Sequence, residues 1–153
     1  MTKALFFDID GTLVSFETHA IPASTIEALT IAHEKGIKIF IATGRPKAII
    51  NNLADIQDRG LIDGYITMNG AYCFVGDEVI YKSAIPAGEV RALAQVCEQK
   101  GYPCIFVGEH TISVCQPNKL VHDIFYDFLH VDEIPVKTFE EAVQEEIFQM
   151  TPF

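Results

Sequence analysis

Residues 4–16 read ALFFDIDGTLVSF, and this stretch decides how the rest of the sequence is interpreted. A short apolar run, typical of a strand buried on both faces of a parallel sheet, leads directly into Asp8 and Asp10. Two carboxylates that close repel each other unless something positive lies between them. Because residues i and i+2 of a strand point to the same side, we expect both carboxylates on one side and Ile9 anchored on the other.

A pair of carboxylates at a strand end suits Mg²⁺, a hard cation that takes carboxylate, water and phosphate oxygens as ligands. Gly11 follows the pair and permits a turn that would expose backbone N–H groups to an anion. The sequence therefore predicts a site for a divalent cation and a phosphate group at the end of the first strand. Two solvated acids at the start of a loop are the simpler alternative.

A second apolar strand is expected over residues 37–44, and it ends in the residues ATGR. Thr43 and Gly44 offer a hydroxyl and backbone N–H groups to an anion. A helix expected over residues 46–56 would begin just after them, and a helix N-terminus favours negative charge.

The carboxyl ends of the strands lie along one edge of an open parallel sheet, and functional residues collect there. The two unusual strand ends are therefore predicted to be neighbours. Asp8 and Thr43 would then lie close together. Arg45 has two equally supported roles at this point, a contact to a phosphate ester or an ordinary ion pair at a helix start.

Strand and helix signals alternate over residues 1–70, which predicts an α/β fold with a Rossmann-like, doubly wound parallel sheet. After residue 70 the pattern changes to a hairpin, a helix over 86–101, an antiparallel strand pair, a helix over 117–131 and a final strand-like segment. This second pattern is typical of an α+β unit. We expect one domain over residues 1–84 and another over 85–153.

The composition restricts the possible partners. The chain of 153 residues has 21 acidic residues against 11 Lys and Arg, a formal net charge of -10, which argues against nucleic acid and anionic membranes. No apolar run approaches the length that spans a bilayer. The four cysteines form no CxxC pair, so we expect buried free thiols in a reducing cytoplasm. The sequence gives no indication of the oligomeric state.

The motifs resemble those of a known family. DIDGTLV, residues 8–14, is similar to the DxDGT motif of the haloacid dehalogenase superfamily of phosphohydrolases, and IATGR, residues 41–45, is similar to its second motif. The spacing between them and the residues MNGA, 68–71, resemble the Cof-type branch of sugar and small-molecule phosphatases. The resemblance implies that residues 1–84 are the N-terminal part of the family's Rossmann-like core and that residues 85–153 begin its α/β cap domain.

Specific roles follow from the resemblance. It implies that Asp8 is the nucleophile, forms an aspartyl-phosphate intermediate and ligates Mg²⁺. Asp10 would protonate the leaving alcohol, then act as base for the water, and contribute its backbone carbonyl to the metal. Thr43 would hydrogen-bond the phosphoryl oxygens, together with backbone N–H groups around Ile9 and Gly44.

Two motifs of the family, a lysine and a final acidic cluster, are not identifiable in this sequence, and family chains are longer. We therefore expect a Mg²⁺-dependent phosphomonoester hydrolase for small phosphorylated metabolites such as sugar phosphates, with the 153-residue chain an incomplete, impaired fragment. The alternatives are a non-catalytic module that binds phosphate or Mg²⁺, and a phosphomutase of the same superfamily. A phospho-accepting receiver domain fits less well, because receivers carry the accepting aspartate on a later strand.

Overall fold

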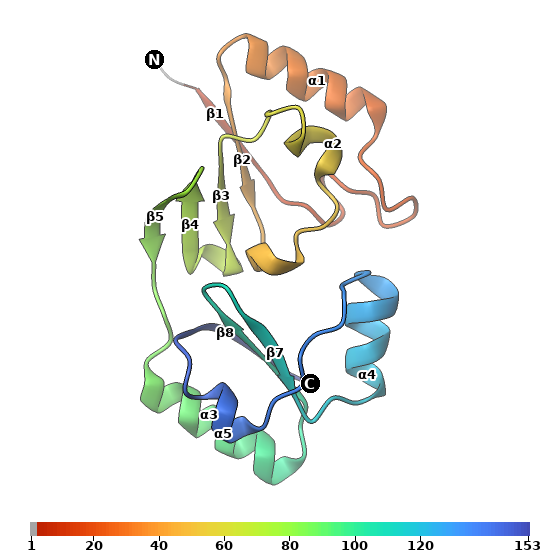
Figure 1. The fold of residues 1–153 in the computed structure, drawn as a ribbon. Helices are drawn as coiled ribbons and strands as arrows, with labels where there is room; N and C mark the ends of the chain where they lie inside the picture. Colours follow the sequence, from red (N-terminus) through yellow and green to blue (C-terminus); the bar gives the residue numbers. More distant parts are fainter. Residues whose placement is uncertain (1–2) are drawn as a thin grey trace. The chain divides into compact units, whose positions relative to one another are not determined.

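The computed structural model describes residues 3–153, which divide into two compact units, Met1–Lys82 and Ser83–Phe153. Figure 1 shows the two units as separate groups of strands and helices, each with a sheet of its own. Each unit is described below by itself.

The first unit contains a five-stranded sheet in the order β1-β2-β3-β4-β5. Its first three strands are parallel, and its last two are added antiparallel. The strands are β1 (Ala4–Phe7), β2 (Lys38–Ala42), β3 (Gly64–Thr67), β4 (Tyr72–Val75) and β5 (Glu78–Lys82). The helical elements are α1 (Ala23–Glu34), α2 (Ala54–Gln57) and the 3₁₀ turns η1 (Lys47–Ile49) and η2 (Met68–Gly70). The predicted α/β architecture with a parallel sheet is confirmed.

The core of the first unit lies on the face of the sheet that α1 and α2 cover. Ile39 and Ile41 of β2 pack there with Leu29 of α1 and Ile56 of α2, and all four side chains are buried. The prediction that the first strand is buried on both faces is wrong, because the side chain of Phe6, which stacks on the ring of Phe40, is 58% exposed. A continuous run of apolar residues cannot tell a covered face of a sheet from an open one.

The prediction of one helix over residues 46–56 is also wrong. The chain makes one 3₁₀ turn, becomes extended at Ile50 and forms the short helix α2 only from Ala54. The carbonyl of Ile49, which a continuous helix would use internally, instead accepts a hydrogen bond from the Arg45 guanidinium at 3.0 Å. A single turn has no appreciable dipole, so an anion site beside Thr43 gains no support from a helix N-terminus.

The second unit has a three-stranded antiparallel sheet in the order β7-β6-β8. Its elements are α3 (Ala87–Lys100), β6 (Cys104–Gly108), β7 (Ile112–Cys115), α4 (Lys119–Val121), the π-helical η3 (His122–Phe128), α5 (Phe139–Ala142) and β8 (Ile147–Pro152). The helix predicted over residues 117–131 is therefore a short α-turn that continues as a π-helix. The predicted final strand is present as β8.

A compact core in the second unit joins α3 and α5 to the central strand β6. Phe106 of β6, 1% exposed, contacts the ring of Phe139 of α5 edge to face at 5.9 Å. Cys97, Cys104 and Cys115 are buried in the same core as free thiols, which confirms the prediction of buried thiols for these three.

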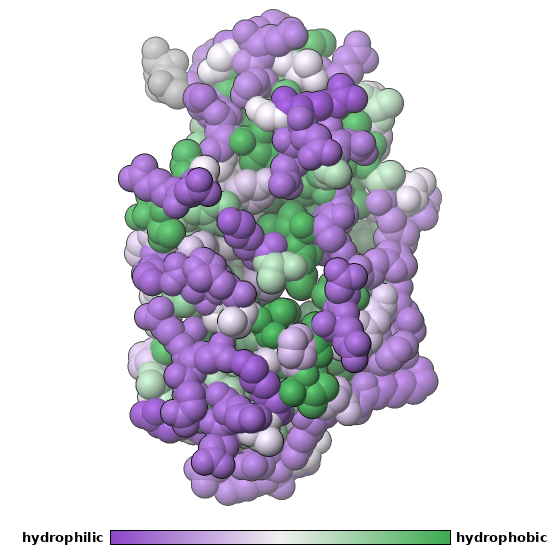
Figure 2. Space-filling view, in the orientation of Figure 1, coloured by the Kyte–Doolittle hydropathy of each residue, from purple (hydrophilic) through white to green (hydrophobic). Residues whose placement is uncertain are grey.

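The surface of both units is mainly hydrophilic on the face shown in Figure 2, with apolar residues in smaller groups. Within residues 3–153, no helix combines the length and the apolar character needed to cross a bilayer.

Candidate functional site

The chain leaves the sheet immediately after β1, at Asp8. Ile9 is fully buried, and its carbonyl accepts hydrogen bonds from the N–H groups of Leu13 at 3.1 Å and Val14 at 2.9 Å. A tight turn, and not a continued strand, therefore carries the two acids. Ile9 anchors the turn as predicted, but the two carboxylates are not placed by strand alternation.

Gly11 occupies the left-handed region of backbone conformation in this turn, with φ of +77°. A side chain here would be strained, and its Cβ would also collide with the ring of Phe16. The N–H group of Gly11 donates to the carbonyl of Val14 at 2.9 Å. The N–H of Gly11 itself thus closes the turn, and the expected exposure of other backbone N–H groups of this turn to an anion stays a prediction.

The parallel pairing of β1 with β2 brings the two polar strand ends together. Phe7 is level with Ile41, so the residues that follow each strand meet at one edge of the sheet. A cavity of about 330 Å³ opens there, and it is lined by Asp8, Ala42, Thr43, Gly44, Ile66, Asn69 and Gly70. The predicted proximity of Asp8 and Thr43 is thus present in the structure.

Thr43 is oriented by a local hydrogen bond. Its hydroxyl oxygen accepts the backbone N–H of Arg45 at 3.0 Å, and its own N–H donates to the carbonyl of Ile66 at 2.9 Å. This hydrogen bond uses a lone pair of the hydroxyl oxygen and not its proton. The Thr43 O–H can therefore still donate to another acceptor. Although Thr43 is only 6% exposed, it lines the cavity, so a bound anion could be that acceptor.

Arg45 forms a two-pronged ion pair with Asp10. Its Nε donates to Asp10 Oδ2 and its Nη2 to Asp10 Oδ1, both at 2.8 Å. Two further acceptors, the carbonyl of Ile49 at 3.0 Å and Oδ1 of Asn51 at 3.3 Å, hold the other arm of the guanidinium. The Arg45 side chain is 8% exposed, so the geometry favours the ion-pair interpretation of this residue. Arg45 is thus the positive partner of Asp10, a role that the sequence alone did not distinguish from a contact to a phosphate ester.

The two acids consequently have different surroundings. Asp8 is exposed to solvent and lines the cavity, whereas both carboxylate oxygens of Asp10 accept hydrogen bonds from Arg45. A Mg²⁺ ion prefers oxygen ligands, and the exposed carboxylate of Asp8 could supply one. The Asp10 side chain is already neutralised by Arg45, so the main-chain carbonyl of Asp10 is the better second ligand. The residues present therefore fit a Mg²⁺ ion in part.

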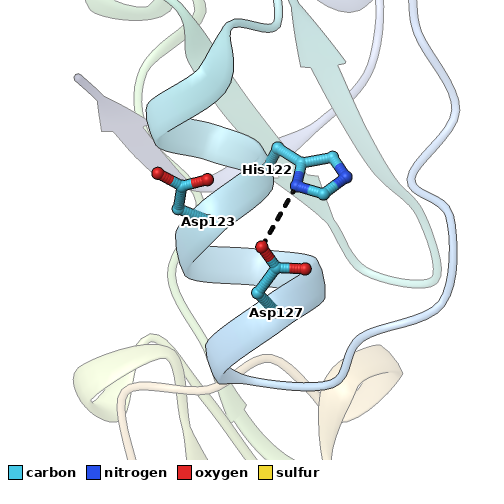
Figure 3. A group of neighbouring side chains, drawn as sticks. All are labelled: His122, Asp123 and Asp127. Atoms are coloured by element: carbon cyan, nitrogen blue, oxygen red, sulfur yellow. Dashed lines mark ion pairs between the residues drawn. The ribbon is translucent and has the colours of Figure 1, made fainter.

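A second group of metal-type ligands lies in the second unit, on η3. Figure 3 shows His122, Asp123 and Asp127, whose ligand atoms lie within 4.8 Å of one another. The π-helix places His122 Nδ1 3.4 Å from Asp127 Oδ2, while Lys119 Nζ lies 2.6 Å from Asp123 Oδ2. The Asp127 side chain is 65% exposed, so solvent screens its charge and no metal ion is needed to balance it. We interpret the group as surface ion pairs.

Comparison with known proteins identifies the family. Residues 5–151 match the model of the haloacid dehalogenase-like hydrolase family. The chain is 29% identical to YkrA of Bacillus subtilis (strain 168) over 157 residues, which cover 99% of this chain and 57% of YkrA.

Solved structures agree with this match. The HAD subclass IIB sugar phosphatase BT4131 is 77% identical with a TM-score of 0.96, over 99% of this chain and 58% of that one. BT1666 from Bacteroides thetaiotaomicron is 36% identical with a TM-score of 0.76, over 96% of this chain and 54% of that one. The chain thus spans somewhat more than half the length of these relatives.

Proposed function

The chain belongs to the haloacid dehalogenase-like hydrolase family, and from this premise we propose that it is part of a Mg²⁺-dependent phosphomonoester hydrolase for small phosphorylated metabolites. Sugar phosphates are the proposed substrate class, because BT4131, at 77% identity, is described as a sugar phosphatase. The observation that carries the proposal is the cavity in which an exposed carboxylate, Asp8, lies beside the hydroxyl of Thr43.

The proposed reaction has two displacements at phosphorus. In the first, a carboxylate oxygen of Asp8 forms a bond to phosphorus while the bond to the ester oxygen breaks, and Asp10 gives that oxygen a proton. In the second, water attacks the aspartyl-phosphate, Asp10 accepts the proton of the water, and phosphate leaves. A carboxylate nucleophile divides one difficult hydrolysis into two easier steps.

The other residues of the site would position the acid and bind the phosphoryl group. Arg45 holds the Asp10 carboxylate through both oxygens, so Asp10 must release at least one of them to carry the proton that the first displacement requires. Thr43 and backbone N–H groups near Ile9 and Gly44 would bind the phosphoryl oxygens, since phosphoryl transfer depends on positioning and on neutralising charge. A Mg²⁺ ion held by Asp8 and the Asp10 carbonyl would supply that neutralisation when bound.

We further propose that residues 1–84 are the N-terminal part of the family's core and that residues 85–153 are the first part of its cap domain. The lysine and the final acidic cluster of the family would then lie in the remaining length of the relatives, so that this chain alone turns over substrate poorly. The proposed location is the cytoplasm.

Hydrolysis of p-nitrophenyl phosphate with Mg²⁺ tests the proposal, in this chain and in a longer protein that contains it. We expect turnover by the longer protein, a fall of at least about 10³-fold in its Asp8→Asn variant, and far lower turnover by this chain. Asp55→Asn, on the exposed surface of α2 in the same unit, is the control and should leave the rate unchanged. Full activity of the Asp8→Asn variant would overturn the proposed mechanism. Full activity of the 153-residue chain would overturn the proposal that it lacks part of the active site.

A further inference from the structure

The loop that follows β3 has an unusual backbone. Met68 and Asn69 adopt φ of 51° and 54°, the left-handed region that side chains other than glycine rarely occupy, and Gly70 continues it with φ of 93°. Two such non-glycine residues in sequence cost conformational free energy and persist only where surrounding contacts enforce them. The strained loop lies at the cavity, because Asn69 and Gly70 line it.

Hydrogen bonds join this loop to the residues at the end of β2. The N–H of Asn69 donates to the carbonyl of Thr43 at 3.2 Å, and the N–H of Met68 donates to the carbonyl of Arg45 at 3.4 Å. The two bonds are on either side of Gly44. The backbone of Asn69 is therefore fixed relative to the threonine that we propose as a phosphate ligand.

The side chain of Asn69 lies over Gly44. A Cβ atom added to Gly44 would be 3.2 Å from Asn69 Oδ1, closer than most such contacts, and 3.5 Å from Nδ2, an ordinary van der Waals distance. A glycine at position 44 thus leaves room for the amide, which is exposed and borders the cavity that contains Asp8. An amide carries two N–H donors and no charge, so it can bind a phosphoryl oxygen without adding to the negative charge of Asp8.

We propose that Asn69 is a phosphate-binding residue of this site, donating an amide N–H to an oxygen of the phosphoryl group that Thr43 also binds. This inference rests on the proposed function, since it assigns a further contact to the same cavity. The ligand is the phosphate dianion or the phosphoryl end of a phosphomonoester, and the sugar or other alcohol does not enter the contact.

A purely conformational role is the alternative, because asparagine tolerates the left-handed region better than most residues. Asn69→Gly separates the two roles, since glycine adopts this conformation freely but has no amide. Asn69→Asp keeps the shape of the side chain and replaces the donor by a carboxylate. Gln116→Gly is the matched control, because Gln116 is an exposed non-glycine residue with φ of 51° that belongs to the second unit and does not line the cavity.

The experiment is a ¹H–¹⁵N NMR titration of the 153-residue chain with inorganic phosphate at fixed Mg²⁺. We expect the side-chain NH₂ signals that are lost in Asn69→Asp to shift during titration of the native chain. We also expect Asn69→Gly to weaken phosphate binding by about tenfold, as for one hydrogen bond to a charged acceptor, and Asn69→Asp to weaken it further. Gln116→Gly should bind as the native chain does.

Each other outcome has a distinct meaning. Native affinity in Asn69→Gly would show that the residue serves the backbone only, which overturns this inference and leaves the proposed function standing. Equal weakening in Gln116→Gly would also overturn it, because the loss would then not be specific to the site. If the native chain binds no phosphate while the longer protein hydrolyses p-nitrophenyl phosphate, the contact is absent from the site as this chain forms it, and the inference fails while the proposed function holds.

Discussion

The two units differ in how far solvent reaches their potentially reactive carboxylates and thiols. In the first unit, Asp8 lies at a cavity and Asp10 is held by a guanidinium. In the second unit, Cys104 and Cys115 are level with each other across β6 and β7, and both are fully buried. Burial raises the pKa of the Cys104 thiol well above its usual range and that of Cys115 to about 11. The difference teaches that access and charged neighbours, more than residue type, decide which groups can react.

Thiol labelling gives the largest expected effect and could break this comparison. A labelling reagent must reach the sulfur atom, so thiols enclosed in the core of the second unit should react only when that unit opens. With Ellman's reagent at pH 8, we expect Cys73, which is half-buried, to react first, and the three buried thiols at least about 100-fold more slowly. Cys73→Ser should remove the fast phase. Four equal rates would contradict the sealed core.

For the first unit, the sequence predicted the strands better than the side-chain contacts. Apolar runs located β1 and β2, and parallel pairing then predicted that Asp8 and Thr43 meet. The course of residues 46–56 was not predictable, because the Ile49 carbonyl bonds to Arg45 and a helical pattern carries no trace of such a contact. The left-handed conformation of Asn69 had one signal, the following glycine, which indicated a turn and not a site residue.

In the second region the sequence predicted the order of elements but not their helical type. Apolar spacing over residues 117–131 fits an α-helix, whereas the middle of the segment, His122–Phe128, is the π-helical η3. The pattern is nearly the same for both, since a π-helix differs by less than one residue per turn. The capping box of Thr138 and Glu141 fixes the start of α5, and its residue types are visible in the sequence although the prediction made no use of them.

The same substitution, made in the core of the second unit and on the open face of the first sheet, sharpens the comparison. Phe106→Ala should destabilise the second unit by about 3–5 kcal/mol, because it leaves a cavity beside Phe139. Phe6→Ala removes a ring that is 58% exposed, so its cost should stay below about 1 kcal/mol. Urea unfolding followed by circular dichroism measures both. Equal losses would mean that the open face of the first sheet is covered in solution.

The ion pair of the first unit should matter less than that buried ring. Arg45→Met keeps the length of the stem and removes the hydrogen bonds to Asp10, Ile49 and Asn51. Breaking a buried ion pair costs about 3–5 kcal/mol, but the Asp10 side chain is 30% exposed, so we expect about 1–3 kcal/mol. Arg59→Met, at an exposed position of the same unit, is the control in urea unfolding. Adding Asp10→Asn to Arg45→Met should restore part of the loss, and a purely additive effect would contradict the pairing.

The smallest expected effect concerns Asp63, the carboxylate that secures the start of β2. Partial burial raises the pKa of Asp63, but hydrogen bonds from Lys38 Nζ at 2.6 Å and the Ile39 N–H at 2.9 Å outweigh it, so the pKa is lowered. A lowered pKa means that this stabilisation is present above the unfolded value near pH 4 and is lost as the pH falls through the folded value. Asp63→Asn should therefore cost about 1 kcal/mol at pH 7 and progressively less below about pH 4. Urea unfolding across this range, with the exposed carboxylate variant Glu78→Gln as control, measures the difference. A cost of Asp63→Asn that is constant with pH would show that the carboxylate's charge does not stabilise this edge of the first unit.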